Sequence, residues 1–543
     1  MTFGGQPNDQ MSPVGGSAGS DAPIDVAAVP HRRSQLRPTR LWTAVFAILA
    51  VALPTIVVMS SDGWIRRGAL LLLLVLPVWW VSRTRDNWTR IMVVVLVAVI
   101  GASSAAMAWQ YAHERFGGLV HTPMAGSTDQ KDFTLMAWTW MTHSSLGVAG
   151  GSPAKEVVDA YENGTAVGPA DRYSAWVGAQ QMSELPQTYS YRAPAYPLLL
   201  GSIWKVTGYQ PDHAALLNIG LLVAAVIVLT VGIIRFIGLP GGVLAGLTLS
   251  ASQEPIRWAA QGLSESLSVL LAAVCVVATL GVLRSSSSWW WLPLGLALGF
   301  LGLTKQMFIV TGLLYLVVVA LVVLFLGTQS RARVMGAAAG AGLVAVTIVL
   351  PWLSYNVSHT GTVELATGTA GWHDMPASYS LAYLGGEDRH SIRERHFDAW
   401  EARTGEVLAD DVSRAKVGRY MWESQYAKGD YLTRLPELMT YKAARSLAVG
   451  PTDWLIRAAA ILGLLVVFRF GVRRDWATAA CLLALPLCLL LFVSLTVEAG
   501  SRLMVTSAVS LAAILGLALQ LYLDREREPD VAQSKRLLSP NRG

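Results

Sequence analysis

Long apolar runs alternate with short polar segments along most of this chain. Runs such as 92–108 and 216–234 contain no charged residue. A helix of about 20 apolar residues crosses the roughly 30 Å hydrocarbon core of a bilayer, so each run predicts a membrane-spanning helix. This criterion predicts about twelve spans, over residues 41–60, 69–82, 91–109, 213–234, 238–252, 264–283, 289–304, 306–327, 334–355, 454–470, 476–496 and 503–523. The expected fold class is an all-α polytopic membrane protein.

Basic residues gather on one side of these predicted spans. The clusters are His31–Arg33, Arg83–Arg90, Arg331–Arg333, Arg473–Arg474 and Arg525–Arg527. With both termini in the cytoplasm, all of these clusters face the cytoplasm, as the positive-inside tendency expects; Arg66 and Arg67 are exceptions. Two long loops, 110–212 and 356–453, then lie on the outer side. Loops of this length are usually functional.

Composition supports a membrane protein and narrows its partners. Of the 543 residues, 53% are hydrophobic and only 14% are charged, whereas soluble proteins carry about 25% charged residues. The net charge of +6 lies in short loops and tails, so it orients the chain and indicates no nucleic-acid partner. The three cysteines lie in apolar spans and give no disulfide framework. An Ala-, Val- and Gly-rich composition without a signal peptide is typical of a bacterial plasma-membrane protein.

Four regions are expected along the chain. Residues 1–40 form a disordered cytoplasmic tail rich in Gly, Pro and Ser, and residues 41–90 form two N-terminal transmembrane helices. Residues 91–523 form the transmembrane core with its two outer loops, and residues 524–543 form a second cytoplasmic tail. No internal repeat is visible in the sequence, which argues against a transporter built from inverted repeats.

The first outer loop offers two carboxylates close to the membrane. On a helix that begins near Thr128, a suitable N-cap, Asp129, Asp132 and Phe133 share one face. Two interpretations are open. Both acids are solvated at the start of an interfacial helix, or one of them is a general base at the membrane surface.

Two cations are expected in the same outer region. Arg192 precedes Pro194 and Pro197, which fix the start of a helix over 195–206. Lys305 is predicted at the outer junction of two spans. Either side chain could bind a lipid phosphate, or simply extend toward the membrane surface as long basic side chains do.

Further charged residues lie at the outer ends of predicted spans or in the second loop. A carboxylate at the position of Glu265 is costly unless it faces a polar cavity, so Glu265 is interpreted as functional. Glu498 and Arg502 are spaced i, i+4 and form either a helix-surface ion pair or part of the same cavity. His373 could ligate a divalent metal with Glu364 or an acid of the first loop, although no ligand spacing supports it.

Together these segments resemble the GT-C-fold glycosyltransferases that use polyprenyl-phosphate sugars, a group that includes protein O-mannosyltransferases and the aminoarabinose transferases of lipid A. The resemblance covers residues 91–520 and depends on order and spacing, since no single motif is specific. The matching segments are Asp129–Ala137, Arg192–Pro197, Ser264–Leu267, Leu303–Lys305 and Pro351–Trp352 with Asn356 and Gly361. The resemblance implies a GT-C-like helix bundle with interfacial helices in two large outer loops.

The chain departs from the family pattern in three respects. Gln130 replaces the Glu that usually follows the leading Asp, and the usual Glu-x-Arg-Tyr segment is loosened to Glu498–Arg502. Two spans over 41–82 precede the usual first one, and the large C-terminal outer domain of some members is missing. Acceptor recognition could therefore differ from that of other members.

The resemblance implies an inverting transfer of a sugar from polyprenyl phosphate to an acceptor hydroxyl at the extracytoplasmic face. The acceptor is a lipid, a glycan or a protein. Asp129 is the expected general base, and Arg192, Lys305 and Arg502 are expected to bind the donor phosphate. The residues expected to contact the sugar or the acceptor are Asp132, Tyr196, Glu265, Glu498 and His373. No cofactor is implied with certainty, and a divalent metal stays a candidate.

Two other functions stay open. A transporter or flippase of lipid-linked sugars would carry charges deep in its spans, whereas most charges here lie at span ends or in loops. A ligase or polymerase that uses lipid-linked oligosaccharides would need outer-loop arginines, and Arg389, Arg393 and Arg395 supply them.

Overall fold

The computed structural model describes the helical core of the chain and a few segments of its outer loops. The described residues are 87–119, 133–134, 136–137, 140–141, 144, 192–208, 212–285, 287–326, 330–360, 398–405, 430–447, 451–496 and 501–538. The predicted spans 41–60 and 69–82 lie outside them. So do four of the predicted site residues, Asp129, Asp132, His373 and Glu498.

The described part of the chain is all-α and contains no strand, which confirms the predicted fold class. Seven of its helices are long and apolar enough to cross a membrane. They are α3 (Asn87–Phe116), α9 (His213–Phe236), α12 (Glu265–Arg284), α14 (Met307–Leu326), α15 (Arg331–Thr360), α21 (Arg473–Thr496) and α22 (Ser507–Leu538). The last of these continues well into the segment expected to be a tail.

Three predicted spans do not meet this criterion. The helix α10 (Leu239–Ala251) has 13 residues, and α13 (Trp291–Gly302) has 12. At 1.5 Å per residue, such helices cover only about 20 Å. The third, α20 (Pro451–Phe470), is long enough but carries Asp453, Arg457 and Arg469. The apolar runs in the sequence were therefore longer than some of the helices they form.

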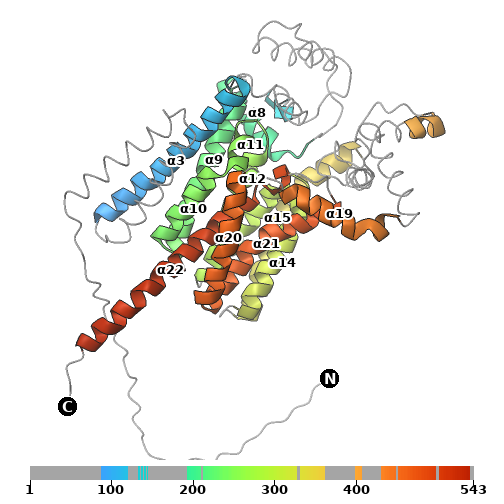
Figure 1. Cartoon of the computed structure of the whole chain (residues 1–543). Helices are drawn as coiled ribbons and strands as arrows, with labels where there is room; N and C mark the ends of the chain where they lie inside the picture. The colour runs from blue at the N-terminus through green and yellow to red at the C-terminus, as the bar shows by residue number, and fades with distance from the viewer. Residues whose placement is uncertain are drawn as a thin grey trace, which may run out of the picture.

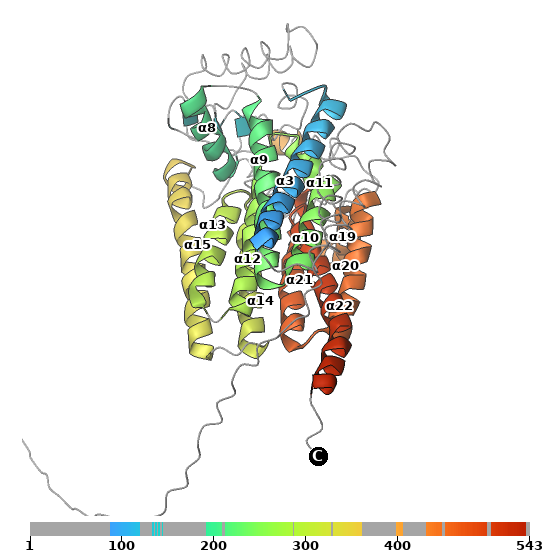
Figure 2. The ribbon, with the colours of Figure 1, turned by 90° about the vertical axis from the view of Figure 1, so that its left-hand side faces the viewer.

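The long helices run alternately up and down, so the connections between them alternate between the upper and the lower end of the bundle. Four shorter elements lie at or near the upper end: α8 (Ala195–Thr207), α11 (Gln253–Ala259), α19 (Asp430–Leu447) and η3 (Ser501–Met504). Figures 1 and 2 show α8 and α11 at the upper end of the bundle, and the C-terminal end of α22 at the opposite end. Arg235, Arg284 and Arg473 lie at helix ends on that lower side.

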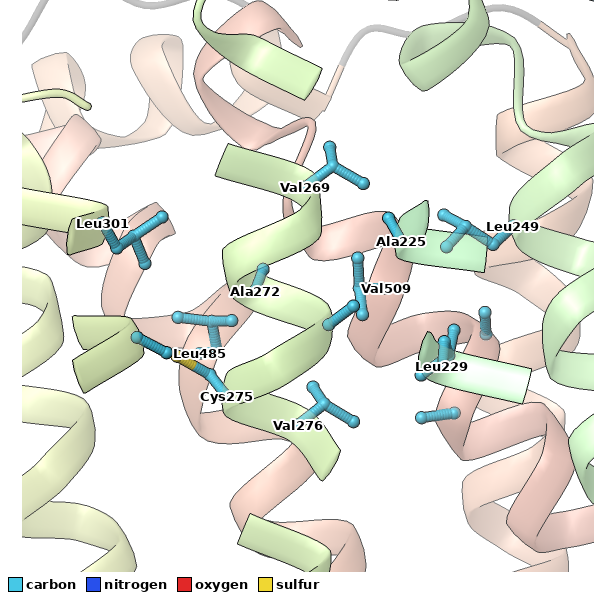
Figure 3. Close-up of a cluster of buried hydrophobic side chains, with 14 of the residues drawn as sticks. Ala225, Leu229, Leu249, Val269, Ala272, Cys275, Val276, Leu301, Leu485 and Val509 are labelled. Carbon is cyan, nitrogen blue, oxygen red and sulfur yellow. The ribbon is translucent and has the colours of Figure 1, made fainter. Parts of the chain in front are cut away.

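Small residues let the helices of the main core approach closely. A Cβ added to Gly241 of α10 would lie 2.5 Å from the carbonyl oxygen of Gly516 in α22. The reverse contact, from Gly516 to the Gly241 oxygen, would be 2.4 Å. Such small-residue contacts are typical of packed membrane helices. Figure 3 shows the apolar side chains of this core, including Leu229, Val269 and Cys275, and all three cysteines are buried and unpaired.

A second hydrophobic cluster lies beneath the upper end of the bundle and is rich in aromatic residues. We call it the aromatic cluster. Its buried members are Phe133, Met136, Ala137, Tyr196, Leu200, Trp204, Ala214, Leu263, Leu303, Val349 and Trp352. It joins a segment of the first outer loop to α8, to the turn before α12, to the turn before α14 and to α15. The segments that carry Arg192, Glu265 and Lys305 therefore share one packed support.

Candidate functional site

The central feature of the site is a carboxylate held by two cations. Glu265 is the first residue of α12 and is completely buried. The Nζ atom of Lys305, in the turn between α13 and α14, lies 2.6 Å from its Oε1 atom. Arg502, in η3, donates a hydrogen bond from Nε to the same oxygen. Three residues that are distant in sequence thus meet in one ion cluster, Glu265–Lys305–Arg502.

The acid and the two cations of this cluster differ in exposure. Glu265 has no exposed side-chain surface, whereas the side chains of Lys305 and Arg502 remain 16% and 21% exposed. A buried carboxylate at the end of an apolar helix is stabilised only when opposite charges pair with it. Its second oxygen, Oε2, has no hydrogen-bond partner among the described residues. The two cations therefore form the accessible side of the cluster, above the acid.

Arg502 is also positioned by an aromatic ring. Its guanidinium carbon lies 5.4 Å from the ring centroid of Trp258, which follows from the position of α11 beside η3. The indole Nε1 of Trp258 donates a hydrogen bond of 2.8 Å to Oε2 of Glu254. A guanidinium stacked over an indole is held by the negative face of the ring. Trp258 and Glu254 therefore restrict where Arg502 can lie.

The segment with Arg192 is attached to the turn with Lys305. The backbone N–H of Ala195 donates to the carbonyl of Leu303, at 2.9 Å. The backbone nitrogen of Arg192 lies 3.4 Å from the sulfur of Met136. Arg192 itself is half-buried. Two predicted motifs, more than 100 residues apart in the sequence, are thus adjacent at the start of α8.

Tyr196 packs inside the aromatic cluster. It is completely buried, its hydroxyl donates to the carbonyl of Ala214 at 3.4 Å, and its ring meets Phe133 edge to face with centroids 5.5 Å apart. Burial, and after it the negative charge of Glu265, raises the pKa of Tyr196, while a hydrogen bond with Asn218 opposes the change. Tyr196 is therefore a neutral packing residue beside the ion cluster, and its predicted contact with substrate stays a prediction.

The residues that follow Asp132 in the sequence pack tightly on α8. Phe133, Met136 and Ala137 are buried. A Cβ on Gly201 of α8 would lie only 2.3 Å from the carbonyl oxygen of Ala137, so only glycine allows this approach. Asp129 and Asp132 themselves lie outside the described residues. The roles predicted for them, and for Glu498 and His373, stay predictions.

A second polar cluster, which was not predicted from the sequence, lies beside the first. Ser252 donates a hydrogen bond from its hydroxyl to Asp453 of α20, and the backbone N–H of Glu254 donates to the other oxygen of Asp453 at 3.1 Å. Both acids are almost fully buried. A cavity of ≈ 20 Å³, about the space of one water, lies between these residues and η3. The signal in the sequence was the position of both acids next to predicted spans.

No group of three or more His, Cys, Asp or Glu residues that could hold a metal occurs among the described residues. The metal ligands considered from the sequence, His373 and Glu364, lie outside those residues. A metal at the site therefore stays a prediction.

An apolar groove begins next to Lys305. It lies between α13, α14 and α15 and has a volume of ≈ 120 Å³. Phe308 and Ile309, three and four residues after Lys305, line its end near the ion cluster, and Gly312, Val346 and Leu350 line the rest. Val346 and Leu350 are 43% and 49% exposed on the outer surface of the bundle. The groove thus runs from the cations toward the lipid-facing surface.

No protein-family model and no curated protein matches the sequence. Among solved structures, the chain is similar to ArnT from Cupriavidus metallidurans bound to undecaprenyl phosphate, with 15% identity and a TM-score of 0.37. The similarity covers 75% of this chain and 63% of that one, so the chain spans less than two thirds of the length of ArnT. A likeness this distant carries no argument about activity or substrate. The function is therefore argued from the residues of the site.

Proposed function

We propose that the protein is an inverting glycosyltransferase that moves a sugar from polyprenyl phosphate to an acceptor hydroxyl at the extracytoplasmic face of the membrane. The observation that carries this proposal is the ion cluster Glu265–Lys305–Arg502. Its two partly exposed cations stand over one buried carboxylate at the end of a membrane-spanning helix. Two cations that reach the surface beside such a helix end suit the phosphate of a lipid whose tail stays in the bilayer.

The cations would act on the leaving group. As the bond between the anomeric carbon and the phosphate oxygen breaks, both electrons go to the phosphate, which gains charge. Arg502 binds phosphate oxygens through its planar guanidinium, and Lys305 acts as a point charge. Arg192 would join them; support comes from the start of α8, which follows Arg192 and is hydrogen-bonded to the turn with Lys305. Fixed charges of this kind stabilise a transition state without reorganising.

Asp129 would act on the acceptor. It takes the proton of the acceptor hydroxyl while that oxygen forms the new bond to the anomeric carbon, and the configuration of this carbon inverts. A positioned base of this kind contributes about 10²–10⁴-fold in rate. Support comes from the packing of Phe133, Met136 and Ala137, which follow Asp129 in the same motif, against the helix entered through Arg192.

The groove between α13, α14 and α15 would hold the first part of the prenyl chain. Its lining is apolar, it opens toward the lipid-facing surface, and its upper end lies within one helical turn of Lys305. A lipid phosphate bound to Lys305 would therefore have its tail directed along the groove. The distribution of basic residues at the lower ends of α9, α12 and α21 supports an extracytoplasmic position of the upper end.

The proposal is tested with the purified full chain in lipid nanodiscs and a radiolabelled polyprenyl-phosphate monosaccharide. A transferase releases polyprenyl phosphate and moves the label to acceptors of a bacterial membrane extract. Asp129→Asn should lower this rate by about 10²–10⁴-fold, while the exposed control Asp398→Asn keeps it. A near wild-type rate in Asp129→Asn would reject the assignment of the base.

The same assay separates the competing functions. In sealed vesicles, a flippase moves the labelled lipid between leaflets with the sugar still attached. A ligase or polymerase ignores the monosaccharide donor and uses a lipid-linked oligosaccharide. Either result, together with no release of polyprenyl phosphate from the monosaccharide donor, would exclude the proposed transfer.

A further inference from the structure

The helix α19 presents a buried polar stripe to the top of the bundle. Leu438, Lys442 and Ser446 are spaced i, i+4 and i+8, so they lie on one face. All three are completely buried, while Glu437 and Thr440 on the other face are exposed. The helix packs against α21 and η3, the element that carries Arg502. Lys442 and Ser446 therefore face the surroundings of the proposed site, although α19 belongs to the second outer loop.

Both polar atoms of this stripe lack a hydrogen-bond partner in the described structure. They are the Nζ atom of Lys442 and the Oγ atom of Ser446, one helical turn apart. Leaving a buried donor unsatisfied is costly, and an unpaired buried ammonium is more costly than a hydroxyl. Burial lowers the pKa of Lys442 to about 8, so this side chain still carries a proton near neutral pH. An anion that bound here would satisfy both donors and balance the charge.

The position of α19 indicates which substrate such an anion belongs to. The donor groove is bounded by α13, α14 and α15, whereas α19 packs against α21 and η3 and contributes no residue to the groove. In an inverting displacement, the acceptor attacks the anomeric carbon from the side opposite to the leaving phosphate. A second anion site beside α19 lies outside the donor groove, which leaves it for the acceptor.

We infer that Lys442 and Ser446 form a second anion-binding subsite, which takes a phosphate or carboxylate group of the acceptor. The assignment of this anion to the acceptor rests on the proposed function, whereas the anion site itself does not. Lys442 supplies the charge and Ser446 supplies a hydroxyl donor. The hydrogen bond from Arg457 of α20 to the carbonyl of Leu447, 2.7 Å long, holds the end of α19 in place.

The anion site is tested with inorganic phosphate as the probe, by following the thermal unfolding of the full chain in an uncharged detergent at constant ionic strength. The Tm should rise with phosphate. The Lys305→Met variant lacks a cation of the donor site and should keep part of this rise in Tm. The double variant with Lys305→Met and Lys442→Met should lose the remaining rise, which corresponds to phosphate binding that is roughly 10- to 100-fold weaker.

Two further variants distinguish a loss of phosphate binding from a folding defect. Ser446→Ala removes one hydroxyl without changing the helix and should weaken the same response several-fold. Arg434→Met removes an exposed cation of the same helix, paired with Glu437, and should leave the response unchanged. Without phosphate, the Tm of Lys442→Met should be no lower than that of the wild type, because an unpaired buried amine is lost. An unchanged phosphate response in Lys442→Met would overturn the inference.

Two arms identify the source of the anion. If nanodiscs of phosphatidylglycerol raise the Tm relative to phosphatidylcholine, and Lys442→Met removes this difference, the site takes a lipid headgroup and the acceptor assignment is wrong. In the transfer assay, Lys442→Met should leave the KM of the polyprenyl-phosphate donor unchanged; a rise in that KM would place Lys442 in the donor site. Phosphate binding at Lys442 without any sugar transfer would reject the proposed function but keep the anion site.

Discussion

The two ends of α12 carry ion clusters of different kinds. At the upper end, one carboxylate, Glu265, meets two cations that are both partly exposed. At the lower end, Arg284 forms a one-to-one pair with Asp475 of α21, with 15% and 8% of the side chains exposed. Asp475 also accepts the backbone N–H of Val472 at 3.1 Å. The same helix thus ends in a three-residue cluster with two partly exposed cations on one side and in a largely buried ion pair on the other.

The difference in exposure separates function from stability. A balanced buried pair needs no further ligand, and its contribution is to fix how α12 packs against α21. In the upper cluster, both cations that hold Glu265 reach the surface. A site that stabilises a phosphate needs such accessible positive charge. We therefore expect mutations at the lower end to change unfolding and mutations at the upper end to change transfer.

Asp475→Asn should have the largest effect, and it should act on stability. It leaves the Arg284 guanidinium buried without an opposite charge, which costs about 3–5 kcal/mol. The expected result is a clear drop in the Tm of the purified protein, while transfer per folded molecule remains. The exposed control Asp398→Asn should keep the Tm. An unchanged Tm with lost transfer would remove the distinction between the two ends.

Arg502→Met should have the next largest effect, and it should act on catalysis. Loss of one fixed donor to a transition-state anion lowers kcat/KM by about 10²–10³-fold. The Tm should change little, because Lys305 still pairs with Glu265. Arg525→Met is the matched control, since Arg525 is an exposed arginine over Phe470 near the other end of the bundle. A kcat/KM close to that of the control would exclude Arg502 from the site.

Trp258→Phe should have a moderate effect on the donor site. It keeps an aromatic ring beside Arg502 but removes the hydrogen bond from the indole to Glu254. Because a hydrogen bond to a charged group contributes about 1.5–3 kcal/mol at most, we expect the KM of the donor to rise by up to tenfold with a smaller change in kcat. Trp289→Phe, an exposed tryptophan of the lower end, should leave both constants unchanged. A fall in kcat alone would mean that Trp258 does not position Arg502.

Tyr196→Phe should have the smallest effect. The hydroxyl contact to Ala214 is long, at 3.4 Å, so its loss should cost at most about 1 kcal/mol. Transfer should stay within a few-fold of the wild type, with a small shift in Tm. A loss of activity as large as that of Arg502→Met would show that Tyr196 contacts a substrate, as the sequence predicts.

The sequence alone determined the helices and the ends at which charged residues lie. Apolar runs of sufficient length predict α9, α12, α14 and α21 because no other local structure satisfies the backbone inside a bilayer. Charges are too costly in the hydrocarbon core, so Glu265, Lys305 and Arg502 had to lie at helix ends or in turns. Their identity as site candidates therefore followed from the printed residues.

Only the tertiary structure decided which of these residues meet. Glu265 and Arg502 are 237 positions apart, and no local spacing relates them; the sequence instead paired Arg502 with Glu498, its neighbour on a helix. The lengths of α10 and α13, and the burial of Lys442 on the amphipathic helix α19, were hidden for the same reason. Local periodicity reports which face of a helix is apolar, whereas the partner of that face depends on how distant segments pack.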